Sequence, residues 1–83
     1  MSIAFKQVKQ GDKNDTVLLV QCLLSALSFI GANNKPLTLD GEYGFNTTFA
    51  VKTFQTTCKA YGKDIRTDGV CDLITLNAMI NKQ

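Results

Sequence analysis

The chain has 83 residues, a formal net charge of +2 and no histidine. Hydrophobic residues make up 45% of it, which is ordinary for a globular protein, so we expect one folded domain rather than a disordered chain. The small charge argues against an electrostatic nucleic-acid binder, and no stretch reaches the roughly 18–20 apolar residues that a membrane span requires.

The first 13 residues are predicted to form an extended arm rather than a helix. They contain the apolar residues Ile3, Phe5 and Val8, followed by the turn-forming pair Gly11-Asp12. We expect the arm to place these apolar side chains on the core and to end in a turn.

A first helix is predicted over residues 15–30. Asn14 and Asp15 are both good N-cap residues, and Gly31 is suited to end the helix. Between them, apolar residues recur at spacings of three and four, which is typical of an amphipathic helix. The residues expected on its apolar side are Val17, Val20, Leu23, Leu24, Leu27 and Ile30.

A long connection is predicted over residues 31–43, because Asn33-Asn34, Pro36 and Asp40-Gly41 all mark turns. A second helix is predicted over residues 45–60, directly after Gly44. Its apolar face is expected to consist of Ala50, Val51, Phe54, Cys58 and Tyr61.

A third, short helix is predicted over residues 72–81, after a second loop. Because it is short, packing rather than intrinsic propensity must hold it. Its core candidates are Leu73, Leu76, Met79 and Ile80. The sequence therefore predicts an all-α fold: a compact three-helix bundle with two Asp-Gly turn loops and an extended N-terminal arm.

An internal repeat organises the second half of the chain. The stretch that begins at Asp40-Gly41 is echoed 28 residues later by the stretch that begins at Asp68-Gly69. Each copy has an Asp-Gly turn, a capping residue, a threonine three residues after it (Thr47 or Thr75) and then apolar helical positions. We expect the threonines to reach back to the caps and the two loops to lie near each other. Such a module presents a surface, and nothing in it resembles a catalytic apparatus.

The three cysteines, Cys22, Cys58 and Cys71, include no Cys-x-x-Cys pair. With no histidine, they cannot complete the four ligands of a structural zinc site, so we expect no metal. Cys22 and Cys58 fall within helical patterns and are predicted to be small core residues. Cys71 is expected at a turn, where its thiol would be open to reaction.

Over roughly residues 8–80, these features resemble the three-helix peptidoglycan-binding domain found on bacterial cell-wall hydrolases. The family pattern contains Asp-Gly-x-aromatic-Gly-x-x-Thr-x-x-Ala-Val-x-x-Phe-Gln, flanked by Val-x-x-Leu-Gln-x-x-Leu and a second Asp-Gly unit. The central motif matches at Asp40, Gly41, Tyr43, Gly44, Thr47, Ala50, Val51, Phe54 and Gln55. Weaker matches to the flanking units are Gly11, Val17, Val20, Gln21, Leu24, Asp68, Gly69 and Thr75, with Met79 in place of the final leucine.

The resemblance implies a non-catalytic, carbohydrate-binding module of a bacterium or phage, with no cofactor. Its ligand would be peptidoglycan or muropeptides, and it would target a linked or associated protein partner, carrying a hydrolase or particle component, to the cell wall. No nucleic acid or membrane is implied. The first residues lack the basic start and apolar core of a signal peptide, so we expect synthesis in the cytoplasm and action at the wall after release or carriage in a particle.

Two departures from the family pattern bear on the site. Asp72 stands where a second glycine is usual, and aspartate caps a helix at least as well as glycine does. The connection over residues 31–39 is longer than usual, so ligand preference would differ if this loop borders the binding groove.

The candidate groove is expected between the turn at 40–47, the turn at 66–72 and polar residues of the first two helices. An aromatic face can hold a sugar while placed polar groups orient it. The candidate ligand-binding residues are Asp40, Tyr43, Phe45, Asn46, Gln55, Asp68 and Gln21.

Each candidate also has a structural interpretation. Asp40 and Asp68 would build their turns through backbone hydrogen bonds, Tyr43 would belong to the core, and Gln21 and Gln55 would bond to loop backbone. Phe45 is expected to be exposed. We do not expect an enzyme, since Asp40 and Glu42, the nearest thing to a glycosidase carboxylate pair, share one loop. The alternative function is a protein-interaction or structural module of a phage or injection particle that reuses the fold.

Overall fold

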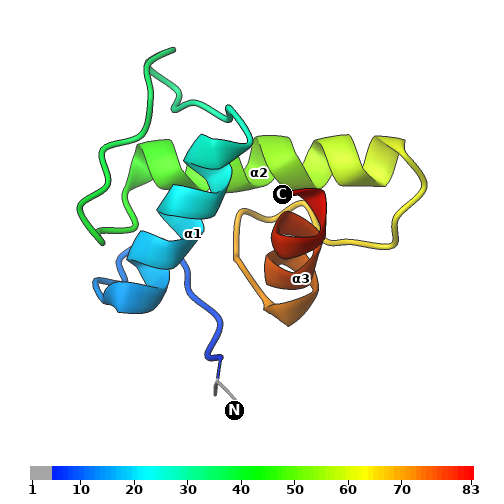
Figure 1. Ribbon diagram of the computed structural model, residues 1–83, viewed down its shortest axis with the longest axis horizontal. Helices are drawn as coiled ribbons and strands as arrows, with labels where there is room; N and C mark the ends of the chain where they lie inside the picture. Colours follow the sequence, from blue (N-terminus) through cyan, green and yellow to red (C-terminus); the bar gives the residue numbers. More distant parts are fainter. Residues whose placement is uncertain (1–4) are drawn as a thin grey trace.

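The computed structural model describes residues 5–83, which contain three helices, α1 (Asp15–Ala26), α2 (Phe45–Ala60) and α3 (Leu73–Lys82) (Figure 1). The longest helix, α2, runs across the molecule, while α1 packs against both α2 and α3. The described residues form only isolated β-bridges and no strand. The predicted all-α, three-helix fold is thereby confirmed.

Helix α1 begins as predicted but ends early. The side chain of Asn14 accepts a hydrogen bond from the Val17 N–H at 2.9 Å, which caps the first turn. The helix was expected to continue to residue 30, yet it ends at Ala26. The cause is Ser28, whose φ of 67° places it in the left-handed region that usually favours glycine.

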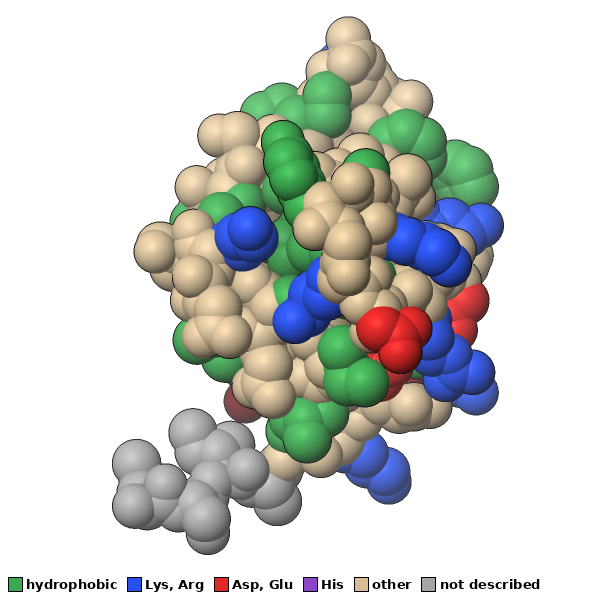
Figure 2. Space-filling model, turned by 90° about the vertical axis from the view of Figure 1, so that its right-hand side faces the viewer, with side chains coloured by type: hydrophobic (Ala, Val, Ile, Leu, Met, Phe, Trp, Pro, Cys, Tyr) green, Lys and Arg blue, Asp and Glu red, His purple; other side chains and the backbone are tan. Residues whose placement is uncertain are grey.

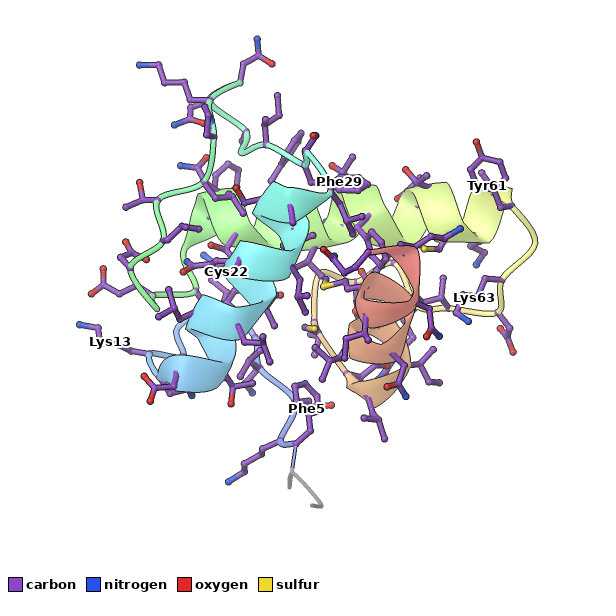
Figure 3. The ribbon with its side chains drawn as sticks, in the orientation of Figure 1. Phe5, Lys13, Cys22, Phe29, Tyr61 and Lys63 are labelled. Carbon is purple, nitrogen blue, oxygen red and sulfur yellow. The ribbon has the colours of Figure 1, made fainter. Side chains whose placement is uncertain are left out.

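The early end of α1 turns the chain back onto the core. The N–H of Phe29 donates to the carbonyl of Leu24 at 3.0 Å, the bond that closes a Schellman motif. The Phe29 ring then packs edge-on against Phe54 of α2, with the ring centroids 5.4 Å apart (Figure 3).

The core contains most of the predicted apolar residues, but α3 is rotated from the expected orientation. Leu73 and Ile80 were predicted to be buried, yet they are 55% and 49% exposed. The buried face of α3 instead centres on Thr75 and Met79, because Thr75 is bonded to Gln55 of α2. The buried apolar residues are Val8, Val17, Val20, Leu24, Leu37, Tyr43, Ala50, Val51, Phe54, Cys58, Ile65, Cys71, Leu76, Ala78 and Met79.

Three further core predictions are wrong. Tyr61 lies at the C-cap of α2, past the packed part of the helix, and is 82% exposed. Cys22 lies on the outer side of α1 and is exposed, and Ile30 is also exposed because it follows the early end of α1.

The extended arm bonds to both Asp-Gly loops. Val8 and Cys71 exchange two backbone hydrogen bonds, of 3.1 and 2.9 Å. Further along the arm, the Gly11 N–H donates to the Tyr43 carbonyl and the Tyr43 N–H donates to the Asp12 carbonyl, both at 2.9 Å. The buried Val8 side chain confirms that the arm packs on the core. Phe5 packs partly against it, and Ile3 lies outside the described residues.

Candidate functional site

The amide of Gln21, buried on α1, holds the first Asp-Gly loop. Its Oε1 accepts the Gly41 N–H at 2.9 Å. Its Nε2 donates to Asp40 Oδ1 at 3.1 Å, to the Glu42 carbonyl at 3.0 Å and to Thr47 Oγ1 at 3.1 Å. One side chain thus fixes both the turn and the first turn of α2.

Gln55 on α2 holds the second loop in the same way. Its Oε1 accepts the Gly69 N–H at 2.9 Å, and its Nε2 donates to the Val70 carbonyl at 2.9 Å and to Thr75 Oγ1 at 3.0 Å. Of the two interpretations offered for the glutamines, bonding to the loops is therefore the one observed. The threonine hydroxyls, Thr47 and Thr75, accept from these amides, whereas we had expected them to reach back to the caps.

The two aspartates build their turns alike. Asp40 Oδ1 accepts the Glu42 N–H and Asp68 Oδ1 accepts the Val70 N–H, both at 3.0 Å. The Glu42 N–H, and then the Gln21 amide, lower the pKa of Asp40 below its ordinary value, because both stabilise the ionised carboxylate. Asp40 is therefore negatively charged at neutral pH.

The loops differ in how the following helix begins. The N-cap of α3 is Asp72, whose Oδ1 accepts the Thr75 N–H at 2.9 Å. The N-cap of α2 is Gly44, and no side chain caps this helix. The Thr47 N–H, which corresponds to that of Thr75, therefore lacks the carboxylate acceptor that Asp72 supplies.

A pocket of about 160 Å³ lies beside the first loop. The ring of Phe45, 67% exposed, stands at it, and Leu37 from the long connection contributes apolar surface. The long connection thus borders the pocket. The polar side chains that line it are Gln21, Thr38, Asp40, Glu42, Asn46 and Thr47.

The structure brings four of the seven predicted site residues to this pocket. These are Gln21, Asp40, Phe45 and Asn46. Glu42, which also lines the pocket, pairs with Lys13 on the arm, with 2.7 Å between Nζ and Oε1 (Figure 3).

The other three predicted site residues lie outside the pocket. Tyr43 is buried, and its hydroxyl donates to the Gly69 carbonyl, which links the first loop to the second. Burial also raises the pKa of Tyr43 above its ordinary value. Gln55 is buried beneath the second loop, and Asp68 lies 3.4 Å from the Arg66 guanidinium.

Sequence reasoning did not select Thr38, Glu42 or Gly44 as site residues. The unusual length of the connection was the signal for Thr38, since an inserted segment beside a candidate groove can supply part of its wall. The signal for Gly44 lay in the repeat itself, where the position equivalent to Asp72 has no side chain.

A second pocket, of about 230 Å³, lies toward the other end of α2 and is apolar. Leu27, Phe29, Phe54, Cys58 and Tyr61 line it; Figure 3 labels Phe29 and Tyr61. The ammonium nitrogen of Lys82 lies 5.8 Å from the centre of the Tyr61 ring. Figure 2 shows the side of the molecule at this end of α2, where Lys and Arg side chains are scattered among tan, green and red ones and do not form one basic patch.

The buried thiol of Cys71 does not match the expectation of a reactive turn cysteine. Its side chain is buried where the arm pairs with the second loop, and burial raises its pKa to about 12. Within residues 5–83, no group of three or more His, Cys, Asp or Glu side chains could hold a metal ion. No helix in that range is long and apolar enough to cross a membrane.

Comparisons with known proteins bear on the fold and on the family of this chain. The crystal structure of the SleB N-terminal domain superposes with a TM-score of 0.79 over 98% of this chain and 97% of that one, at 18% sequence identity, which shows a shared fold. No curated protein matches the sequence. A family profile described as "Putative peptidoglycan binding domain" matches residues 13–79, which include both Asp-Gly loops. Because this match spans most of the chain, the protein belongs to the peptidoglycan-binding domain family.

Proposed function

We propose that this chain binds peptidoglycan without catalysing a reaction on it, and that it holds a linked or associated protein partner at the cell wall. The observation that carries the proposal is the family match over residues 13–79, which contain the polar pocket beside the first loop. The pocket combines an exposed aromatic ring with carboxylate and amide side chains, the combination that suits sugars and peptides.

In this proposal, each residue at the pocket has a separate task. The exposed ring of Phe45 covers the apolar face of a sugar or peptide group, while Asp40 and Asn46 orient it through hydrogen bonds. Gln21 acts indirectly, by holding Asp40 and the turn in place, because its amide is already hydrogen-bonded to them. Gln55, Tyr43 and Asp68 support the second loop and its contact with the first.

We expect each module to bind weakly. A pocket of about 160 Å³ surrounds only part of a muropeptide, so little area is buried. An assembly that displays several modules, or a partner that binds the wall as well, would compensate through effective concentration. The wall suits such a mode, because its repeating units present many copies of one ligand.

Sedimentation with purified, insoluble peptidoglycan sacculi tests the proposal. We expect the wild-type chain to sediment with the sacculi. We expect Phe45→Ala and Asp40→Asn each to lower the affinity for sacculi by about tenfold, measured from the bound fraction as a function of sacculus concentration. The matched controls are Tyr61→Ala, an exposed aromatic at the other end of α2, and Asp68→Asn, the same turn residue in the second loop. Both controls should sediment like the wild type. Release of soluble sugar from the sacculi would contradict the non-catalytic role.

No sedimentation of the wild type at high protein concentration would overturn the wall-binding function. The protein-interaction alternative would then be pursued at the exposed apolar residues of α3, which are Leu73, Ile74 and Ile80.

A further inference from the structure

We propose that α3 pairs with α3 of a second copy of this chain, antiparallel and across a twofold axis, so that the protein forms a weak homodimer. The surface that makes the contact is named the α3 face, and it consists of Leu73, Ile74, Asn77 and Ile80 of α3 with Leu19 of α1. The pairing goes beyond the proposed function and does not depend on it.

The α3 face is apolar although it is open to solvent. Leu73, Ile74 and Ile80 are 55%, 52% and 49% exposed, on a helix of only ten residues, and Leu19 beside them is 46% exposed. Leu19, Leu73 and Ile80 line one hollow, and Ile74 lies next to Leu73, so the four side chains form one continuous patch. A continuous apolar patch on the surface of a small protein marks an interaction site.

The size of the patch suits a weak pair. Its four large side chains are each about half exposed, and together they present on the order of 400 Å². Two copies that face each other hide on the order of 800 Å² from these side chains alone. The polar residues at the edge bring the total toward the roughly 1,200 Å² at which specific interfaces begin. We therefore expect association at high protein concentration rather than an obligate dimer.

The α3 face has a hollow on one side and a projecting side chain on the other. The hollow, of about 260 Å³, lies between α1 and α3, and Leu19, Leu76 and Ile80 line it together with Phe5 of the arm. Ile74 is not part of this lining, because residues two positions apart on a helix point in nearly opposite directions. A twofold axis perpendicular to α3 places Ile74 of each copy over the hollow of the other. The face is thus complementary to itself, as a twofold interface requires.

The charges at the ends of α3 favour the antiparallel direction. Asp72 stands directly before the helix and Lys82 is its last residue, and no residue between them is charged. An antiparallel pair brings Asp72 of one copy near Lys82 of the other, whereas a parallel pair would bring like charges together. The helix dipoles also oppose each other in the antiparallel arrangement, which is the favourable one.

Asn77 sets the register of the pair. It is exposed and lies midway between Asp72 and Lys82, so it stands at the twofold axis. There its amide donates to, and accepts from, Asn77 of the second copy. A single amide within an apolar stripe fixes register, because any shift would bury the amide without a partner. In this register, Leu73 of one copy opposes Ile80 of the other.

Pairing through α3 leaves the pocket beside the first loop open. That pocket is lined by residues of α1, of the long connection and of the start of α2, and none of its lining residues belongs to α3. The dimer therefore presents two such pockets. Where the pockets bind the wall, two joined modules raise the apparent affinity through effective concentration.

Sedimentation velocity of the full chain tests the pairing. We expect a monomer at about 5 µM and a dimer at about 1 mM, with a dissociation constant on the order of 100 µM. Leu73→Glu and Ile80→Lys should each raise this constant at least about tenfold, because a charge is then buried against an apolar side chain. Both variants should fold, since each charge suits its end of the helix dipole, and circular dichroism checks this. Leu39→Glu, at a position of similar exposure in the long connection, should dimerise like the wild type.

Mixing the two variants decides the direction. In the antiparallel register, the glutamate introduced in one chain opposes the lysine introduced in the other, while the second contact of the pair keeps its wild-type leucine and isoleucine. We expect an equimolar mixture to form a heterodimer with an affinity within about threefold of that of the wild type. The double variant Leu73→Glu/Ile80→Lys should likewise form a homodimer. A mixture that stays monomeric, with a dimeric wild type, would overturn the antiparallel pairing.

A wild-type chain that stays monomeric at about 1 mM would overturn the proposal as a whole. If deletion of residues 1–4 from such a monomer then moves the amide chemical shifts of α3, the chain's own first residues occupy the face. If the deletion leaves them unchanged, the face belongs to a different protein. None of these measurements uses wall material, so a failure of the proposed wall binding is seen separately, in the sedimentation with sacculi.

Discussion

The two Asp-Gly loops of this protein share one hydrogen-bond scaffold, but the helices that follow them begin differently. In both, a buried glutamine from the preceding helix accepts a glycine N–H and donates to a threonine hydroxyl. In both, the aspartate accepts the N–H of the residue two positions on. Beyond this scaffold they diverge, because the side chain of Asp72 caps α3 while Gly44 gives α2 no side-chain cap.

The comparison separates the residues that shape both loops from the residues that are found in the first loop only. The glutamine, aspartate, glycine and threonine recur in both loops, so their first task is structural. The differences lie at the cap, at the exposed ring of Phe45 and in the long connection that brings Leu37 and Thr38 to the pocket. A binding function is therefore to be sought in what the first loop has and the second lacks.

The largest expected effect comes from removing the two glutamines. Gln55→Ala should lower the free energy of unfolding by about 3 kcal/mol, because it leaves the buried Gly69 N–H and Thr75 hydroxyl without partners. Gln21→Ala should cost less, about 2 kcal/mol, since water can reach its exposed partner Asp40. Urea denaturation checks the order, with exposed Thr56→Ala as the control. The reverse order would mean that the first loop is the more tightly held.

The next effect concerns the contact between the loops. Tyr43→Phe keeps the ring in the core and removes the hydrogen bond from the Tyr43 hydroxyl to the Gly69 carbonyl. We expect a loss of about 1.5 kcal/mol, because the carbonyl is then buried without this partner. Tyr61→Phe, at an exposed position, should leave the free energy of unfolding within a few tenths of a kcal/mol of the wild type. If Tyr43→Phe changes the free energy of unfolding no more than Tyr61→Phe does, the hydrogen bond between the two loops contributes no measurable stability.

Exchanging the caps should have opposite effects on stability. Asp72→Ala should lower the free energy of unfolding by about 1 kcal/mol, since α3 loses its side-chain cap. Gly44→Asp should raise it by about 0.5 kcal/mol, through a new cap and a favourable interaction with the helix dipole. Thermal denaturation of both variants checks the signs. If Gly44→Asp instead lowers the free energy of unfolding, the backbone at the start of α2 does not accept an aspartate cap in the way that the start of α3 does.

The smallest expected effect is the pH dependence that Asp40 contributes. A carboxyl whose pKa is lowered on folding stabilises the folded state above its unfolded pKa, and this stabilisation is lost as the pH falls through the folded pKa. The stability difference between the wild type and Asp40→Asn should therefore be constant near neutral pH and shrink below about pH 4. Urea denaturation as a function of pH measures it, and a difference that persists to about pH 2 would argue against the role of ionised Asp40.

Much of this scaffold could be predicted from the sequence because it depends on local patterns. The Asp-Gly turns, the N-cap at Asn14 and the start of α2 after Gly44 each follow from residue types at fixed spacing. The burial of Val17, Val20 and Leu24 follows from helical periodicity. The exposure of Phe45 and the structural bonds of both glutamines were among the interpretations that the sequence offered.

The errors arise where tertiary contacts override local patterns. Ser28 ends α1 in a left-handed conformation that is rare for serine, so nothing in the sequence marked it. Leu73 and Ile80 are exposed because Gln55 draws Thr75 inward and rotates α3. The groove that the sequence predicts between both loops stays a prediction: the pocket beside the first loop takes no lining residue from the second, and a separate pocket at the start of α3 is lined by Asp72, Leu73 and Ile74.

The pairing of Val8 with Cys71 has a consequence for folding. The arm bonds to the first loop at Tyr43 and to the second at Cys71, so the earliest described segment and the last loop are joined directly. Neither copy of the repeat can complete its set of hydrogen bonds alone, which differs from a solenoid, where each unit contacts only its neighbours. Closing so long a chain segment carries an entropic cost that is recovered only when both loops are in place. We therefore expect the domain to unfold as one cooperative unit, despite its internal repeat.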